Sequence, residues 1–408
     1  MPTPRFGRLR RFRFNFPQRI AAALLLLFLA QGLWLASRQA MSEGEAQYAR
    51  CGREMWERPA TLAGGQSPCA GLSDGILAYR LAGLPLSLRR LAEEGMDRLR
   101  KPENRLLPDG GLSSDSALNT GALRHRLTCL LLLLRLPFLA TGCLLGGALW
   151  WVTRRLFGDL GGYTALAFYC FSPADLHACT QPNAEILAAL AVYGGVYTCI
   201  GVAHAMQGPK RKWKPRIVLL AMLLAAAATA HPGALAAVLL LGLAFMLWLG
   251  EERRGQMMPV VLVALTGALA ATVLCYGFQL DAFLTLFHRS ALSVRLSPQS
   301  FLTIFAALSN GGLTVAALAA LAYYAACRRA RFFGNTAPLL CALLLIPLQF
   351  RNVAATPWLW ALPFLLTFTG GVFADAYEEP RGRLMQAAVG ALALAQAVLC
   401  LFSVAGGL

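Results

Sequence analysis

Long apolar segments alternate with short polar ones along most of this chain. A helix of about 20 apolar residues crosses the 30 Å hydrocarbon core of a bilayer, and this unit recurs many times. We therefore predict an all-α polytopic membrane protein with about eleven transmembrane helices. The expected spans are residues 20–37, 127–152, 161–179, 184–204, 217–231, 233–250, 258–278, 300–326, 336–350, 355–376 and 384–403.

The apolar run at 217–250 needs a break, because roughly 34 residues exceed the length of one span. His231-Pro232-Gly233 interrupts this run, and a Pro-Gly pair favours a turn. We predict two helices that meet at His231.

The polar stretch 38–126 separates the first span from the others, and we expect it to carry interfacial helices. Within residues 79–101, Pro85 is suited to open a helix, with Leu88, Leu91 and Leu99 on one face and charged residues on the other. Such a helix lies in the plane of a membrane interface. Residues 102–121 are rich in Pro, Gly and Ser and predict an exposed loop.

Cys51 and Cys69 are the only cysteines in the 38–126 stretch. On an oxidising side of the membrane they would form a disulfide, and elsewhere they would stay free thiols. The sequence leaves both states open.

Composition and the placement of charges narrow the class of protein and its expected partners. The chain is 57% hydrophobic and 14% charged, which excludes a soluble domain, and its net charge is +17. The basic residues fall in alternate loops, the positive-inside pattern, so we expect contacts with anionic membrane lipids and no nucleic-acid partner. The predicted organisation is a cytoplasmic basic tail at 1–19, an anchor at 20–37, an extracytoplasmic loop at 38–126 and a multi-span bundle at 127–408.

The first apolar segment has two interpretations. Its preceding arginines resemble the n-region of a signal peptide, but no clear small-x-small cleavage site follows. We predict a retained anchor with the N-terminus in the cytoplasm, in a bacterial inner membrane or in its eukaryotic counterpart, the endoplasmic reticulum.

Several motifs occur in the order found in membrane glycosyltransferases of the GT-C class. They are Arg135-Leu136-Pro137, Arg154-Arg155-Leu156-Phe157-Gly158, Phe171-Ser172-Pro173 and Pro182-Asn183-Ala184. The chain resembles most the protein O-mannosyltransferases and the lipid A aminoarabinose transferases. Residues 44–49 and 53–55 resemble the acidic motif of that family's first outer loop, and 228–241 and 351–371 resemble two later motifs. The resemblance covers most of the chain.

This resemblance implies a GT-C bundle that transfers a sugar from a polyprenyl-phosphate donor to a protein, lipid or glycan acceptor on the extracytoplasmic face. A carboxylate would deprotonate the acceptor hydroxyl. Glu45 matches the family's Glu, whereas the family's Asp position holds Gly44, and Glu43 is a possible replacement. The alternative is that these acids line a solvated helix, as we expect for Glu54 and Glu57.

Three cationic or polar residues are candidates for binding the donor phosphate. Arg351 matches the family's Arg before a proline-rich helix, and its alternative role is a headgroup anchor. His231 occupies the family's Lys position and can donate a hydrogen bond when neutral. Arg135 is a second possible anion contact, or it snorkels to the interface.

The second outer loop, SPADLHACTQPNAE, contributes Asp175, His177 and Asn183 as further candidates. Asp175 and His177 are too few ligands for a closed metal site, so no metal site is predicted, although a divalent metal ion is left open. No cofactor is indicated.

Asn183 stands where the family has Asp. Together with Gly44, it leaves open a catalytically degenerate scaffold, or a subunit that binds or transports lipid-linked sugars.

Overall fold

A computed structural model of the chain describes residues 16–57, 69, 75–99, 119–207, 213–250, 254–278, 283–284, 311–327, 335–349, 359–378 and 382–406. These residues form helices and turns and contain no strand. The helices are α1 (Phe16–Arg38), α2 (Glu43–Glu57), α3 (Ile76–Leu99), α4 (Asn119–Cys170), α5 (Pro173–Thr180), α6 (Glu185–Met206), α7 (Lys214–Ala230), α8 (Pro232–Ala237), η4 (Val238–Gly242), α9 (Leu243–Leu249), α10 (Arg254–Cys275), α13 (Gly312–Cys327), α14 (Ala337–Gln349), α15 (Leu362–Tyr377) and α16 (Gly382–Gly406).

Several of these helices are long and apolar enough to cross a membrane. Six candidates meet both criteria, namely Phe16–Arg38, Thr128–Cys170, Glu185–Met206, Pro232–Leu249, Gly255–Cys275 and Gly382–Ala405. The chain is therefore a multi-pass helical membrane protein. Within the described residues, eleven spans are not shown: α13 and α14 are shorter apolar helices, and the predicted spans 300–326 and 355–376 extend into residues outside the described ranges.

Two of the predicted spans are joined in α4. A straight helix of 52 residues would be about 78 Å long. Instead the backbone leaves the helical conformation at Gly158, with φ 82° and ψ −176°, values that favour glycine. The Tyr169 hydroxyl donates to the Gly142 carbonyl at 2.7 Å, so the two arms lie side by side. The predicted turn between 152 and 161 thus falls at Gly158.

The predicted break at His231 is confirmed. Helix α7 ends at Ala230, and His231 is extended, with φ −157° and ψ 127°. Pro232 then occupies the first turn of α8, where its missing N–H costs no hydrogen bond.

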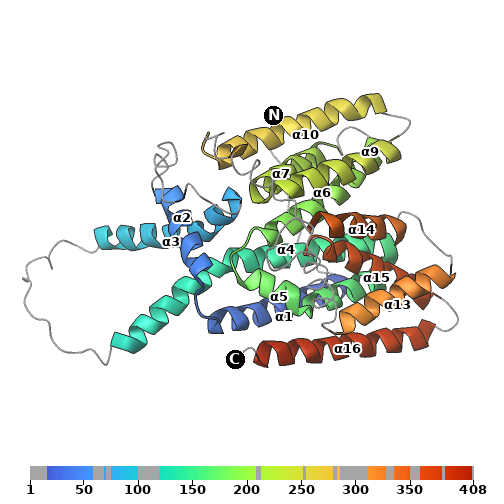
Figure 1. Ribbon diagram of the computed structural model, residues 1–408, viewed down its shortest axis with the longest axis horizontal. Coiled ribbons are helices and arrows are strands. Elements are labelled where there is room, and N and C mark those ends of the chain that lie inside the picture. Colours follow the sequence, from blue (N-terminus) through green and yellow to red (C-terminus); the bar gives the residue numbers. More distant parts are fainter. Residues whose placement is uncertain are drawn as a thin grey trace, which may run out of the picture.

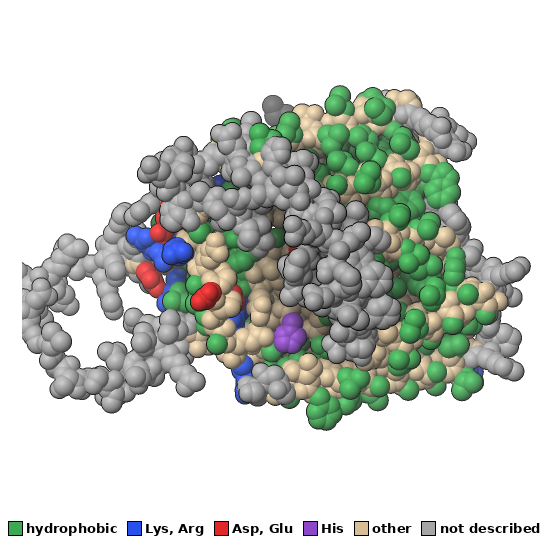
Figure 2. Space-filling model, in the orientation of Figure 1, with side chains coloured by type: hydrophobic (Ala, Val, Ile, Leu, Met, Phe, Trp, Pro, Cys, Tyr) green, Lys and Arg blue, Asp and Glu red, His purple; other side chains and the backbone are tan. Residues whose placement is uncertain are grey.

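Helices α2 and α3 lie together at one end of the bundle, where α1 ends (Figure 1). We call this end the α2 end. Charged side chains gather there, whereas hydrophobic side chains cover much of the remaining visible face (Figure 2). The helix predicted to open at Pro85 instead begins at Ile76, with Pro85 inside α3. Leu88 and Leu91 are exposed, as an interfacial helix requires.

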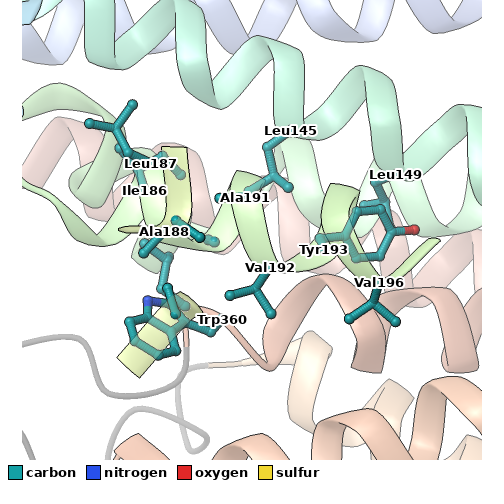
Figure 3. Packing of buried hydrophobic residues seen from close by; sticks show 14 of the residues in the cluster. Leu145, Leu149, Ile186, Leu187, Ala188, Ala191, Val192, Tyr193, Val196 and Trp360 are labelled. Carbon is teal, nitrogen blue, oxygen red and sulfur yellow. The ribbon is translucent and has the colours of Figure 1, made fainter. Parts of the chain in front are cut away.

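The bundle core is centred on α6. Side chains of α6, including Ile186, Ala191 and Val196, are enclosed between Leu145 and Leu149 of α4 on one side and the segment around Trp360 on the other (Figure 3). Within this core the Tyr193 hydroxyl pairs with Thr367 Oγ1 of α15 at 2.8 Å. Interhelical hydrogen bonds of this kind hold helices together where lipid offers no hydrophobic driving force.

Candidate functional site

The first part of the candidate site is the corner between α1 and α2. Ser42 precedes α2, and its Oγ accepts from the Glu45 N–H at 3.2 Å. In return, Glu45 Oε2 accepts from the Ser42 N–H at 2.9 Å. This reciprocal pair is a capping box, which satisfies two backbone donors that the start of a helix leaves open. The position of Glu45 therefore follows from the way α2 begins.

Arg135, on α4, binds the same carboxylate. Its Nε donates to Glu45 Oε1 at 2.7 Å and its Nη2 to Glu45 Oε2 at 2.8 Å. The remaining N–H groups donate to the carbonyls of Ala36, Gln39 (3.0 Å) and Ala40 (3.1 Å). All five N–H groups of the guanidinium are thus used, in the planar fork geometry that favours Arg over Lys.

This ion pair is almost sealed from solvent, with Arg135 1% and Glu45 3% exposed. A buried charge pair is tolerated only when each partner is hydrogen-bonded and the geometry is good. Helix polarity adds to the fit, since Arg135 caps the negative C-terminal end of α1 and Glu45 lies in the positive first turn of α2. The structure brings these two predicted site residues together, and they bind each other rather than a substrate group. Their predicted roles in deprotonation and phosphate binding stay predictions.

The neighbours of Glu45 are open to the surroundings. Glu43 is exposed at the start of α2. A side chain at Gly44 would meet only Ser42 Oγ, at 3.9 Å from the added Cβ. The position where the resembling family has its acid is therefore empty space in this chain.

His231 lies next to the start of α3. The Gly75 N–H donates to the Ala230 carbonyl at 3.1 Å, which joins α3 to the break between α7 and α8. His231 Nδ1 accepts from the Gly233 N–H at 3.0 Å, and its ring meets the Trp360 ring edge-on at 5.1 Å. Arg351, the other candidate for the donor phosphate, lies outside the described residues.

Helix α5 carries the candidates of the second loop. It begins with Ser172, whose hydroxyl accepts from the Asp175 N–H, followed by Pro173 in the first turn. The Asp175 side chain is 0% exposed, and neither carboxylate oxygen has a hydrogen-bond donor of good geometry. Burial raises the pKa of Asp175 to about 7, although the nearby Ser172 hydroxyl lowers it somewhat. At neutral pH this carboxyl is therefore close to half-ionised, and it is mainly protonated below that pH.

His177 has different surroundings from Asp175, although the two are only two residues apart. It is half-buried, and its Nδ1 lies 3.3 Å from Gln39 Nε2 at the end of α1. Burial lowers the pKa of His177 below its ordinary value of 6.5. The described residues contain no group of three or more His, Cys, Asp and Glu side chains that could hold a metal ion.

Asn183 joins α5 to α6. Its Nδ2 donates to the Ala178 carbonyl at 2.6 Å, and its Oδ1 accepts from the Ile186 N–H at 3.1 Å. Both ends of the amide therefore bind the backbone that connects the two helices. This structural role accounts for an Asn at position 183 without a bound ligand.

The two cysteines of the predicted loop are joined. Cys51 and Cys69 form a disulfide with a Cα–Cα distance of 5.7 Å, so the oxidised alternative is the one that the structure adopts. Around this disulfide, the Tyr48 and Tyr79 rings stack at 4.3 Å, which ties α2 to α3.

Two contributors to this site were missed by the sequence analysis. The pattern Ser42-x-x-Glu45 is a recognisable capping-box signal, and it indicates why Glu45 has this position. Gln39 gives no such signal, because its contacts with Arg135 and His177 depend on residues about 100 or more positions away.

Comparisons with family models, with curated proteins and with solved structures found no match to this chain. The resemblance to the GT-C glycosyltransferases therefore rests on the motifs alone.

Proposed function

We propose that the protein is a membrane glycosyltransferase that moves a sugar from a polyprenyl-phosphate donor to an acceptor. In this proposal the α2 end faces the extracytoplasmic side of a bacterial inner membrane, and the N-terminus lies in the cytoplasm. The acceptor is a protein, lipid or glycan that the α2 end admits.

One observation carries the proposal: the buried Arg135–Glu45 pair holds the corner between α1 and α2. This pair unites two motifs of the resembling family that lie 90 residues apart in the sequence. A buried ion pair is a costly way to stabilise a fold, which favours a positional role for it. Glu45 and Arg135 thus act as positioning residues at the edge of a reaction site.

The donor phosphate is assigned to Arg351 and His231. Arg351 would supply charge and His231 a hydrogen bond, and a charge-assisted hydrogen bond contributes about 1.5–3 kcal/mol. The acceptor hydroxyl needs a base, for which Glu43 and His177 are the accessible candidates at this end.

The test incubates the purified full-length chain with a membrane extract as the source of acceptor and with polyprenyl phosphates carrying radiolabelled mannose, glucose or aminoarabinose. It measures the transfer of label out of the donor lipid together with the release of free polyprenyl phosphate. Arg351→Ala is expected to reduce release about 10–100-fold. Arg89→Ala is the matched control, because Arg89 pairs with exposed Glu93 on α3. An inactive wild type on all donors, or an unaffected Arg351→Ala, contradicts the proposal.

A second candidate is a catalytically degenerate subunit that binds a lipid-linked sugar without transferring it. The observation that favours it is the empty space at Gly44 beside a fully engaged Glu45. Saturable binding of the same donors without any release of polyprenyl phosphate would support this candidate.

A further inference from the structure

The pairing of His177 with Gln39 has the form of a catalytic base and its orienting group. Nδ1 of the imidazole lies 3.3 Å from the Gln39 side-chain amide. Gln39 is itself held in place, because its backbone carbonyl accepts from Arg135. A base whose second nitrogen is bound by a third group is the arrangement that enzymes use to set the tautomer of a histidine.

The amide of Gln39 can present either of its ends to the ring. Nε2 now faces Nδ1, while Gln39 Oε1 is buried and has no hydrogen-bond partner. A half-turn of the amide brings Oε1 to Nδ1, where it accepts the Nδ1–H. His177 Nε2 then keeps its lone pair and can accept a proton.

The surroundings of His177 keep this lone pair available near neutral pH. Burial lowers the pKa of His177. No charge contributes from the titratable groups on the helices packed against α5, which include Arg38 on α1, Cys170 on α4, Glu185 on α6 and Cys400 on α16. The imidazole is thus mainly neutral at pH 7, as a base must be.

Two of the carboxyl groups nearby are less suited to meet an acceptor. Both oxygens of Glu45 are engaged by Arg135, and Asp175 is completely buried, so exposed Glu43 is the competing candidate. Half-buried His177 keeps part of its ring accessible at the same end of the bundle.

We propose that His177 is the general base that deprotonates the acceptor hydroxyl, with Gln39 as its positioning residue. This inference rests on the proposed glycosyltransferase function. The acceptor oxygen forms a bond to the anomeric carbon while the bond from that carbon to the phosphate oxygen breaks. The acceptor proton passes to His177 Nε2, and polyprenyl phosphate leaves with the electron pair. The imidazolium then returns its proton to water.

The first test replaces His177 and measures the release of polyprenyl phosphate. His177→Asn is expected to lower kcat about 10²–10⁴-fold with KM for the donor little changed. His204→Asn is the matched control, because His204 is exposed in the last turn of α6, away from α5. A fall in kcat of less than threefold for His177→Asn overturns the inference.

The pH profile separates His177 from Glu43. With His177 as base, kcat/KM of the wild type falls on the acid side of an inflection that lies below the ordinary imidazole value of about 6.5, because burial lowers the pKa of His177. A glutamate base with an ordinary pKa would hold activity down to about pH 4.3. An acid limb near 4.3 overturns the inference and leaves the glycosyltransferase proposal intact. The Asp175→Asn variant should show the same fall in kcat/KM at low pH as the wild type. If the fall is absent in this variant, the titrating group is Asp175 and not His177.

Variants of Gln39 test its positioning role. Gln39→Leu should lower kcat, while Gln39→Glu should retain activity and move the acid limb upward by about one pH unit, because a neighbouring carboxylate favours the imidazolium. A purely structural Gln39 would leave the limb in place and contradict this role. A wild type that releases no polyprenyl phosphate from any donor removes both this inference and the function on which it rests.

Discussion

Two adjoining regions at the α2 end, the corner between α1 and α2 and the helix α5, each bury a carboxyl group and treat it in opposite ways. Glu45 at the corner is bound by a guanidinium and a backbone N–H. Asp175 on α5 has no donor of good geometry on either oxygen. The contrast shows that burial alone does not determine the charge of a carboxyl group.

The difference follows from the cost of moving a charge out of water. That cost is several kcal/mol for each ion, so a buried carboxylate needs a partner or must take up a proton. Arg135 supplies the partner at the corner, while α5 provides none, and the pKa of Asp175 is raised by burial. An ion pair therefore stabilises the corner, whereas the surroundings of Asp175 on α5 favour its protonated, uncharged form.

The largest expected effect comes from removing Arg135. Arg135→Ala leaves Glu45 buried without its cation and uncaps the end of α1, so the free energy of unfolding should fall by about 3–5 kcal/mol. Thermal and denaturant unfolding of the purified protein in detergent measures this loss. In a double-mutant cycle with Glu45→Ala, the two single losses should not add; additive losses would mean that the pair does not hold the corner.

The corner also shows where the sequence is informative and where it is not. The motifs placed Glu45 and Arg135 among the site residues, and the hydrophobic pattern predicted the break at His231. The pairing of Glu45 with Arg135 could not be predicted, because local spacing carries no information on contacts 90 residues apart. The expected helix start at Pro85 is wrong, because Pro85 lies inside α3, which begins at Ile76.

The second prediction concerns the pH dependence that Asp175 imposes. Its pKa is about 7 in the folded protein and about 3.9 when unfolded, so the folded state binds more protons between these values. The stabilisation is complete below about pH 4 and is lost as pH rises towards 7. We expect the wild type to lose about 2–4 kcal/mol over this window relative to Asp175→Asn, whose side chain does not ionise.

Unfolding of both proteins between pH 4 and pH 8 measures this difference, and the subtraction removes the contributions of all other groups. Glu43→Gln is the control for the loss of one acid, because that side chain is exposed on the surface. Parallel curves for the wild type and Asp175→Asn would mean that Asp175 keeps an ordinary pKa.

The third prediction is that the disulfide stabilises the corner through α2. Cys51 and Cys69 close a loop of 18 residues, and cross-linking a loop of this length contributes about 3 kcal/mol by restricting the unfolded chain. Cys69→Ser should therefore lower the unfolding free energy by about 2–4 kcal/mol. Reductant should destabilise the wild type by a similar amount and leave the variant unchanged; equal sensitivity of both would indicate that the disulfide contributes nothing.

The smallest effects compare two glycines of α2. A Cβ on Gly52 would overlap the backbone of Tyr79 and Gly83, where α2 crosses α3, whereas a Cβ on Gly44 meets only Ser42 Oγ at 3.9 Å. Gly52→Ala should cost about 1–3 kcal/mol through overpacking. Gly44→Ala should change stability by at most about 0.5 kcal/mol, as an open surface position allows.

Both variants remove the same entropy from the unfolded chain, so their difference reports the contact between α2 and α3 alone. Thermal unfolding of the two variants side by side gives that difference. If Gly52→Ala proved as stable as Gly44→Ala, α2 would not be packed against α3 at this crossing. The position of α2 at the corner would then depend on Arg135 and the disulfide, without support from packing against α3.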